Sequence, residues 1–236
     1  MKALILNSGL GSRMGVLTAN QPKCMTEITA GETILGRQLG YLQRAGVDDI
    51  VITTGYYNTV LEDYCKSLDL PVSITFINNP LYKETNYIYS IFCAREVVKE
   101  QDIILMHGDI VFDYSVLEEM LAKPCSCMKV SSTEPLPGKD FKAVVVNGKV
   151  KAVGVEFFES AMEAQALYKL NRNEWQQWLD KICEYCESGE TNCYAEKALN
   201  EITDRCSIEI FDAKDRLCTE VDDVQDLERV RERIGR

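Results

Sequence analysis

The first half of the chain alternates short apolar runs with amphipathic stretches, and this alternation restricts the fold more than any other feature. The apolar runs cover residues 2–6, 48–56, 71–79 and 101–109, and the helical stretches cover residues 33–45, 59–68, 86–98 and 114–122. Alternation of strand and helix is typical of a parallel sheet covered on both faces. We therefore predict an α/β fold with a Rossmann-like, mostly parallel sheet and helices on both faces.

The second half of the chain has a different pattern. Residues 142–158 form two β-rich runs joined by Asn-Gly-Lys, which predicts a hairpin. We expect helices near residues 160–188 and 192–204, a strand at 206–211, and a closing amphipathic helix at 223–234. The pattern predicts a single domain, 1–236, with a small β-rich insertion in its second half.

A glycine-rich loop follows the first predicted strand, in the segment LNSGLGSRMG at residues 6–15. Gly9 and Gly11 allow a tight turn whose backbone N–H groups can approach an anion, and Arg13 adds a positive charge. Residues 1–44 hold five basic and two acidic side chains, a balance of +3 in a chain of net charge −11. The loop is therefore suited to a phosphate group.

A second basic feature follows at Pro22-Lys23, ten residues after Arg13. The combination G-x-G-[ST]-R and then P-K resembles the signature of the nucleotidyltransferase superfamily of the sugar-nucleotide pyrophosphorylase type. The resemblance implies catalytic roles for Arg13 and Lys23. It also implies nucleotide contacts from Leu6, Asn7, Ser8, Gly9, Gly11 and Ser12. Asn7 and Ser8 stand where that superfamily usually has two alanines, which affects the expected contacts to the base.

Asp109 lies where a parallel sheet gathers its ligands, at the carboxyl end of a strand. Asp109 follows the apolar run 101–109 and lies five residues before the next helical stretch, too early to cap it. Asp222 precedes the closing helix, where either Asp222 or Asp223 could be the N-cap. In the superfamily that this chain resembles, one acid from each place binds Mg²⁺, so the resemblance implies a magnesium site at Asp109 and Asp222.

Three further stretches resemble the small phosphocholine and 2-aminoethylphosphonate cytidylyltransferase branch of that superfamily. They are NNPLYKETNYIYSIF, CYAEKALNEI and EVDDVQDLERV. This resemblance implies that Asn86 and Ser90 help to hold the cytidine, and that Tyr194 and Glu196 face the ammonium end of an acceptor. It divides the single domain into a nucleotide-binding core, 1–125, and an acceptor-binding part with the closing helix, 126–236.

A cationic acceptor would be held by aromatic faces and carboxylates. The candidate aromatic residues are Tyr82, Tyr87, Trp175 and Tyr194. Lys142 and Lys169, in the stretches GKDFKAVVV and ALYKLNRNEW, could hold the phosphate or phosphonate of the acceptor. The alternatives are that these aromatic residues belong to the core and that the lysines are ordinary surface residues.

The bulk composition limits the class of protein. An excess of acidic residues argues against nucleic-acid binding, which needs a basic surface. The apolar runs are too short for a membrane span or a secretory signal, so ten scattered cysteines are expected to be reduced thiols of a cytoplasmic protein. Cys183 and Cys186 form one C-x-x-C, for which a structural role on a helix is favoured over zinc binding. The sequence leaves open whether the protein forms a homodimer.

These features together predict a cytidylyltransferase that uses CTP and Mg²⁺. Its acceptor is a small alcohol or amine carrying a phosphate or phosphonate, with phosphocholine and 2-aminoethylphosphonate as the leading examples, and its by-product is pyrophosphate. Two alternatives stay open, a hexose-1-phosphate nucleotidyltransferase using UTP or dTTP, and a non-catalytic nucleotide-binding regulatory domain. The retention of Arg13, Lys23, Asp109 and Asp222 argues against the regulatory domain.

Overall fold

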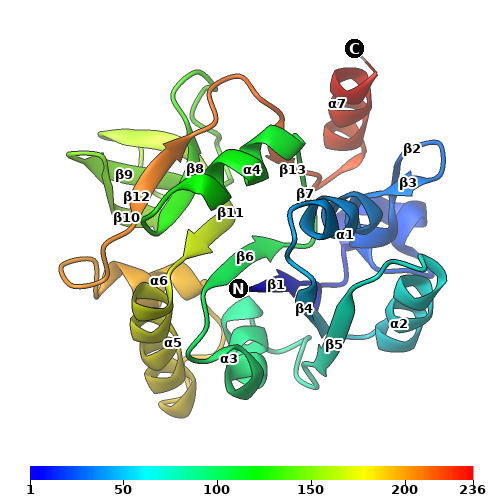
Figure 1. Ribbon diagram of the computed structural model, residues 1–236, viewed down its shortest axis with the longest axis horizontal. Helices are drawn as coiled ribbons and strands as arrows, with labels where there is room; N and C mark the ends of the chain where they lie inside the picture. The colour runs from blue at the N-terminus through cyan, green and yellow to red at the C-terminus, as the bar shows by residue number, and fades with distance from the viewer. Residues whose placement is uncertain (236) are drawn as a thin grey trace.

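The computed structural model describes residues 1–235, and a nine-stranded sheet passes through the whole of it (Figure 1). The strands of this sheet are β1 (Lys2–Leu6), β4 (Asp49–Thr54), β5 (Ser73–Asn78), β6 (Ile103–His107), β8 (Cys127–Ser131), β9 (Lys142–Val146), β10 (Lys149–Gly154), β11 (Ala161–Leu170) and β12 (Glu209–Asp212). Their order across the sheet is β5-β4-β1-β6-β11-β8-β12-β10-β9. Two small ribbons complete the strands, β2 (Glu27–Thr29) with β3 (Glu32–Thr33), and β7 (Ile110–Phe112) with β13 (Cys218–Glu220).

Helices cover the sheet in the pattern that an α/β fold requires. They are α1 (Ile34–Arg44), α2 (Asn58–Ser67), α3 (Tyr87–Val98), α4 (Tyr114–Ala122), α5 (Arg172–Glu187), α6 (Ala195–Asn200) and α7 (Val224–Ile234), with 3₁₀ turns η1 (Ser12–Thr18) and η2 (Lys23–Met25). Successive side chains of a strand point to opposite faces, and Ala3, Leu4 and Ile5 of β1 are all fully buried. The central strands therefore need cover on both faces.

The two halves of the sheet differ as the sequence pattern predicts. Strands β5, β4, β1 and β6 are all parallel, which confirms the alternating fold of the first half. Beyond β6 the sheet becomes mixed, because β11 pairs antiparallel with both β6 and β8. The predicted hairpin forms as β9 and β10 and extends the far edge of the same sheet.

One expected element is wrong. The predicted helix near residues 160–188 is split, since Ala161–Leu170 is strand β11 and only Arg172–Glu187 is helical. Residues 161–170 read AMEAQALYKL, rich in strong helix formers. Their place in the middle of the sheet, with almost every side chain buried, outweighs this local preference.

The β7–β13 ribbon brings together Asp109 and Asp222, two candidate site residues that lie far apart in the sequence. Glu220 of β13 pairs with Ile110 of β7, and the N–H of Val221 donates to the carbonyl of Asp109 at 3.0 Å. Asp222 therefore follows directly beside Asp109, although 112 residues lie between them in the sequence. Asp223, not Asp222, caps helix α7, with its side chain accepting from the N–H groups of Gln225 and Asp226.

Two findings bear on the class of protein. No helix within residues 1–235 combines the length and the apolar character needed to cross a bilayer. All ten cysteines are free thiols, and Cys183 and Cys186 lie on helix α5.

Candidate active site

The glycine-rich loop and Lys23 are packed against each other. Gly11 has a φ of 63°, and a Cβ placed on it would lie 2.9 Å from the Cβ of Lys23. The hydroxyl of Thr18 donates to the carbonyl of Gly11 at 2.9 Å and holds the loop in this conformation. Only glycine has both the backbone freedom and the small size that this approach needs. The loop therefore carries Lys23 and Arg13 to one side of a shared cleft.

Four predicted residues form one cluster of charges. The ammonium of Lys23 lies 2.6 Å from Asp109 Oδ2 and 2.7 Å from Asp222 Oδ1. The guanidinium of Arg13 lies 2.9 Å from Asp222 Oδ2. Lys23 is mostly buried, whereas Arg13 is exposed. The structure thus brings Arg13, Lys23, Asp109 and Asp222 together at the carboxyl edge of the sheet, and their roles stay predictions.

The charges of this cluster stabilise one another. Burial disfavours the charged form of Lys23, but the carboxylates of Asp109 and Asp222 outweigh this effect and raise its pKa above the usual value. Burial also acts to raise the pKa of Asp109, but the nearby Lys23 and His107 outweigh it and lower that pKa. Lys23 is therefore an ammonium and Asp109 a carboxylate near neutral pH.

The same two aspartates fit a divalent cation. Both carboxylates contact a single ammonium, so they already share one small cationic group. Asp109 Oδ1 is buried and has no hydrogen-bond partner within residues 1–235, which leaves a lone pair for a ligand. Mg²⁺ takes one or two carboxylates and keeps its other positions for phosphate oxygens and water. Asp109 and Asp222 are suited to that role.

A first cleft of about 350 Å³ lies over the charged cluster. Its lining includes the predicted nucleotide residues Leu6, Asn7, Gly9, Gly11, Ser12 and Asn86, together with Arg13, Lys23, Asp109 and Asp222. Its lining combines the glycine-rich loop with two cationic side chains, Arg13 and Lys23. It can accept a chain of phosphates.

A second pocket of about 280 Å³ continues from this cleft and is lined by Ser8, Asn86 and Ser90 among others. A chain of polar side chains supports it: the amide of Asn79 donates to Ser90 Oγ, Ser90 Oγ to Ser8 Oγ, and Ser8 Oγ to Thr53, each at 3.0–3.1 Å. Asn86 begins helix α3, where its side chain accepts from the N–H of Tyr87. The pocket offers fixed donors and acceptors of the kind that a nucleobase edge needs.

Asn7 occupies space that Gly108 leaves free. A Cβ on Gly108 would lie 1.7 Å from Asn7 Oδ1, so any other residue at position 108 requires the Asn7 side chain to move. The N–H of Gly108 also donates to the carbonyl of Leu6 at 3.0 Å. The Asn7 side chain thus packs onto the loop that carries Asp109. Asn7 stands where the superfamily usually has alanine, and its larger side chain fits because residue 108 is glycine.

A third pocket of about 360 Å³ lies on the other side of the charged cluster. One wall is aromatic, with Tyr87 stacked on Tyr194 at 5.9 Å and Phe141 edge-on to Tyr194 at 5.1 Å between ring centroids. Carboxylates of Asp140, Glu220 and Asp222 lie within 4.8 Å of one another on another wall. Aromatic faces beside carboxylates favour a cationic ligand group.

Three predicted acceptor residues do not line this pocket. Glu196 is buried beneath the aromatic wall, where its carboxylate accepts from the hydroxyls of Tyr87 and Tyr168, so the predicted direct contact with an ammonium group is wrong. Lys142 is fully buried, with its ammonium donating to the carbonyls of Pro137 and Asp140. Both side chains support the pocket from behind.

Lys169 is the clearest correction. Its ammonium donates to the carbonyls of Lys123 and Cys125. Lys169 pairs with Ile104 near the amino end of β6, whereas the site lies at the carboxyl end. The prediction of an acceptor contact for Lys169 is therefore wrong.

The four candidate aromatic residues lie in different parts of the structure. Tyr87 and Tyr194 line the third pocket, and Tyr82 lines the second. Trp175 is fully buried and donates to the carbonyl of Val98, so it belongs to the core, as the alternative interpretation had it. Tyr194 is in extended conformation just before α6, which turns its ring toward the pocket while Glu196 enters the core.

Sequence reasoning missed several residues of the third pocket. Lys139 and Asp140 line it, three and two residues before the predicted Lys142. The sequence indicates the stretch GKDFKAVVV but not which of its lysines faces the pocket, because the contacts that bury Lys142 form only in the folded loop. His107 and Glu220 line it too and form a pair at 3.1 Å. His107 and Glu220 each lie two residues before a predicted metal ligand, and this position in the sequence is the feature that could have identified them.

Comparison with known families agrees with this site. Residues 3–135, more than half of the chain, match the family described as "MobA-like NTP transferase domain". The chain therefore belongs to the MobA-like NTP transferase family, and the matched segment contains the glycine-rich loop, Lys23 and Asp109.

Several characterised relatives share part of their length with this chain. It is 31% identical over 166 residues to a CMP-5'-(3-aminopropyl)phosphonate synthase of Streptomyces rubellomurinus, covering 70% of this chain and 26% of that protein. It is 33% identical over 126 residues to the CTP:phosphoglutamine cytidylyltransferase of Campylobacter jejuni, covering 51% and 48%. It is 36% identical over 124 residues to the choline-phosphate cytidylyltransferase of Haemophilus influenzae, covering 52% and 49%. The chain spans about half or less of the length of these relatives.

Solved structures share the whole fold. A CTP:phosphocholine cytidylyltransferase from Streptococcus pneumoniae superposes with a TM-score of 0.78 at 20% identity, covering 99% of this chain and 98% of that one. A UDP-glucose pyrophosphorylase complexed with UDP-glucose gives 0.81 at 16% identity, covering 99% and 98%. These likenesses establish the nucleotidyltransferase fold.

Proposed function

We propose that this protein transfers CMP from CTP to a small amine or amino alcohol that carries a phosphate or phosphonate, and that it releases pyrophosphate. The observation that carries the proposal is the cluster of Arg13, Lys23, Asp109 and Asp222, which lies between a nucleotide-sized cleft and a pocket with an aromatic and acidic wall. The three relatives named above support CTP as the nucleotide, and they support phosphonates, phosphoglutamine and phosphocholine as the range of acceptors.

The proposed reaction needs no general base. An oxygen of the acceptor phosphate or phosphonate is already an anion, and it forms a new bond to the α-phosphorus of CTP. The bond from the α-phosphorus to the bridging oxygen breaks, and both its electrons leave with pyrophosphate. The difficulty is the meeting of two anions, so the contribution of the protein is neutralisation of charge and alignment.

Lys23 and Arg13 supply that neutralisation from this chain. Lys23 is mostly buried and charged, so its ammonium acts in a region of low dielectric where it is most effective. Arg13 is exposed at the cleft and is the side chain suited to meet the leaving pyrophosphate. Asp109 and Asp222 would hold Mg²⁺, whose chemistry is to screen the phosphate oxygens and favour in-line transfer.

The third pocket supports an acceptor with a cationic end. Tyr87, Tyr194 and Phe141 present rings, and Asp140 presents a carboxylate. Lys139 lines the same pocket and is the side chain suited to the acceptor's anionic end. A hexose 1-phosphate has no positive group to match this wall, so the pocket favours amino-alkyl acceptors over sugars.

An assay of pyrophosphate release tests the proposal. CTP, UTP and dTTP are each offered with phosphocholine, 2-aminoethylphosphonate, phosphoglutamine and glucose 1-phosphate. We expect release with CTP and an amine-bearing acceptor. Release with UTP or dTTP and glucose 1-phosphate would replace this proposal by the sugar nucleotidyltransferase. Binding of CTP with no release across the panel would favour a non-catalytic domain.

A further inference from the structure

A fourth pocket of about 300 Å³ lies between β11, β13 and helix α7. It adjoins the third pocket, because Asp140, Glu220 and Asp222 line both of them. Two polar side chains of β11, Glu163 and Gln165, also line the fourth pocket, although they are only 6% and 4% exposed. Neither of these two residues has a role in the reaction proposed above.

The contacts of Glu163 fix the orientation of the Gln165 amide. One oxygen of the Glu163 carboxylate accepts from the buried ammonium of Lys129, and the other accepts from Gln165 Nε2 at 2.7 Å. Turning the amide around would place its oxygen against the carboxylate, and two acceptors cannot share a hydrogen bond without a proton. Gln165 Oε1 is therefore the free end of the amide.

This free oxygen lacks a donor. Gln165 Oε1 is buried and accepts no hydrogen bond within residues 1–235. A buried acceptor without a donor is unfavourable, so an N–H group that enters the pocket and reaches this oxygen gains a hydrogen bond at a prepared position. The side chain thus indicates a ligand with an N–H group.

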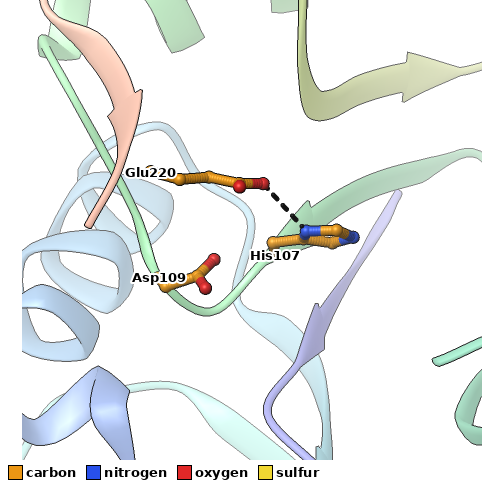
Figure 2. A group of neighbouring side chains, drawn as sticks. All are labelled: His107, Asp109 and Glu220. Atoms are coloured by element: carbon orange, nitrogen blue, oxygen red, sulfur yellow. Dashed lines mark hydrogen bonds and ion pairs between the residues drawn. The ribbon is translucent and has the colours of Figure 1, made fainter. Parts of the chain in front are cut away.

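The other charged groups of the fourth pocket already have partners. Glu220 Oε1 lies 3.1 Å from His107 Nδ1, and Figure 2 shows this pair. The arginines that line the pocket are each paired with an acid: Arg216 with Glu119, Arg229 with Asp226, and Arg233 with Glu134. Among the residues that the structure describes, the pocket therefore offers an acceptor for an N–H group but no unpaired cation for an anion.

We propose that the fourth pocket receives the amino end of the acceptor and selects an ammonium group that carries N–H over a quaternary ammonium. This inference rests on the function proposed above and names the class of acceptor as primary amines. Gln165 Oε1 accepts the N–H group, and Asp140, on the wall between the two pockets, supplies a negative charge. The carbon chain of the acceptor lies along the aromatic wall of the third pocket.

The aromatic wall alone would give no preference for N–H groups. A cation–π contact needs only a positive charge near a ring face, and a quaternary ammonium meets this need well. A hydrogen-bonding site instead rejects an analogue that lacks the donor, because its own acceptor is then left unpaired. The degree of methylation of the acceptor nitrogen therefore separates the two modes of recognition.

A methylation series of one acceptor provides the test. Phosphoethanolamine and its N-methyl, N,N-dimethyl and N,N,N-trimethyl derivatives, the last of which is phosphocholine, keep the same phosphate. They also keep one positive charge on nitrogen near neutral pH, while the N–H groups are removed one at a time. We measure kcat/KM for each with CTP and Mg²⁺, and Kd for each by isothermal titration with Mg²⁺ alone.

Phosphoethanolamine is expected to exceed phosphocholine by at least about tenfold in kcat/KM and in affinity. The largest decrease should come with the last methyl group, because only then does Gln165 Oε1 lose its donor. Gln165→Met, which keeps the length of the side chain but removes the amide, should reduce the ratio to within about threefold. Gln177→Met, on the surface of α5, is the matched control and should keep the ratio.

The wild-type series decides the inference even if Gln165→Met does not fold. An equal or higher value for phosphocholine, or a ratio that folded Gln165→Met retains, would overturn it. Where the acceptors bind only together with CTP, the kcat/KM series decides alone. The expected order of Kd values without any release of pyrophosphate would overturn the proposed function and leave this inference standing. Neither binding nor release with all four acceptors would overturn both.

Discussion

The ammonium of Lys23 lies 2.6 Å from the carboxylate of Asp109. Lys23 is proposed to neutralise the phosphates and Asp109 to hold the metal ion, so these two groups bind each other in this structure. The same ammonium also reaches Asp222 at 2.7 Å. A cation bound between Asp109 Oδ2 and Asp222 Oδ1 would take the place of the Lys23 ammonium, which would then be available to the nucleotide. We therefore expect binding of the metal ion to release the Lys23 ammonium from the two aspartates.

This exchange predicts opposite effects of Lys23→Met on binding and on turnover. Without a competing ammonium, Mg²⁺ should bind the nucleotide-free protein about fivefold more tightly, equivalent to about 1 kcal/mol for a half-buried pair. Turnover should fall by about 10²–10³, since a charge aimed at the transition state is lost. Isothermal titration and a pyrophosphate assay measure the two effects, with Lys66→Met, on the exposed face of α2, as the control. Unchanged turnover would remove Lys23 from the mechanism.

Neighbouring aspartates give a matched test of the magnesium site. Asp109→Asn and Asp222→Asn should each abolish activity at ordinary Mg²⁺, and raised Mg²⁺ should restore part of it, because an amide is a poorer ligand than a carboxylate. Asp223→Asn should be nearly silent, since Asp223 caps helix α7 and asparagine caps as well as aspartate. Wild-type activity in either of the first two variants, or activity without any divalent metal, would place the metal elsewhere.

The contact between Asn7 and Gly108 predicts a rescue. Gly108→Ala should lower the free energy of unfolding by about 1–3 kcal/mol, because the new methyl group would overlap the Asn7 side chain. Asn7→Ala removes that side chain, so adding Gly108→Ala to this background should cost much less. Urea unfolding of the four proteins in the double-mutant cycle measures the coupling. Additive losses would show that the two residues do not share this space.

The aromatic wall predicts a change confined to the acceptor. Tyr194→Leu should raise the KM for an amine-bearing acceptor by about 2- to 30-fold, the range of a cation–π contact, while the KM for CTP stays the same. Tyr56→Leu is the control, as Tyr56 is an exposed tyrosine outside this pocket. Glu196→Gln should act mainly on stability, since its carboxylate serves Tyr87 and Tyr168. Equal increases in both KM values for Tyr194→Leu would argue against an acceptor role.

Burial of the thiols predicts which cysteines react. Burial raises the pKa to about 12 for Cys65, Cys127, Cys186, Cys206 and Cys218. At pH 8 these five should resist iodoacetamide in the folded protein and react fully in urea, because the thiolate is the nucleophile. The four partly exposed cysteines, Cys93, Cys125, Cys183 and Cys193, should be labelled first. Peptide mass spectrometry reads the order, and early labelling of Cys127 or Cys218 would contradict the packing described above.

The sequence by itself determined the parts of this protein that depend on neighbours along the chain. Apolar periodicity located the parallel strands and helices of the first half, and Asn-Gly located the β9–β10 hairpin. Glycine and proline placed Arg13 and Lys23 beside a loop, because φ limits act within a few residues. The rule that ligands gather at the carboxyl ends of parallel strands placed Asp109 at the edge of the sheet, whereas Asp222 was assigned there by family resemblance.

Only the tertiary structure decided which side chains of the second half face the site. Residues 161–170 have helix-forming composition, yet pairing with β6 and β8 makes them a central strand. That register carries Lys169 to the opposite edge. The Lys142 ammonium is buried against the carbonyls of Pro137 and Asp140, which leaves Lys139 at the pocket. Glu196 is buried against Tyr168 of the same strand. His107 meets Glu220 only because β7 and β13 pair across more than 100 residues, and such long-range pairing leaves no local pattern in a sequence.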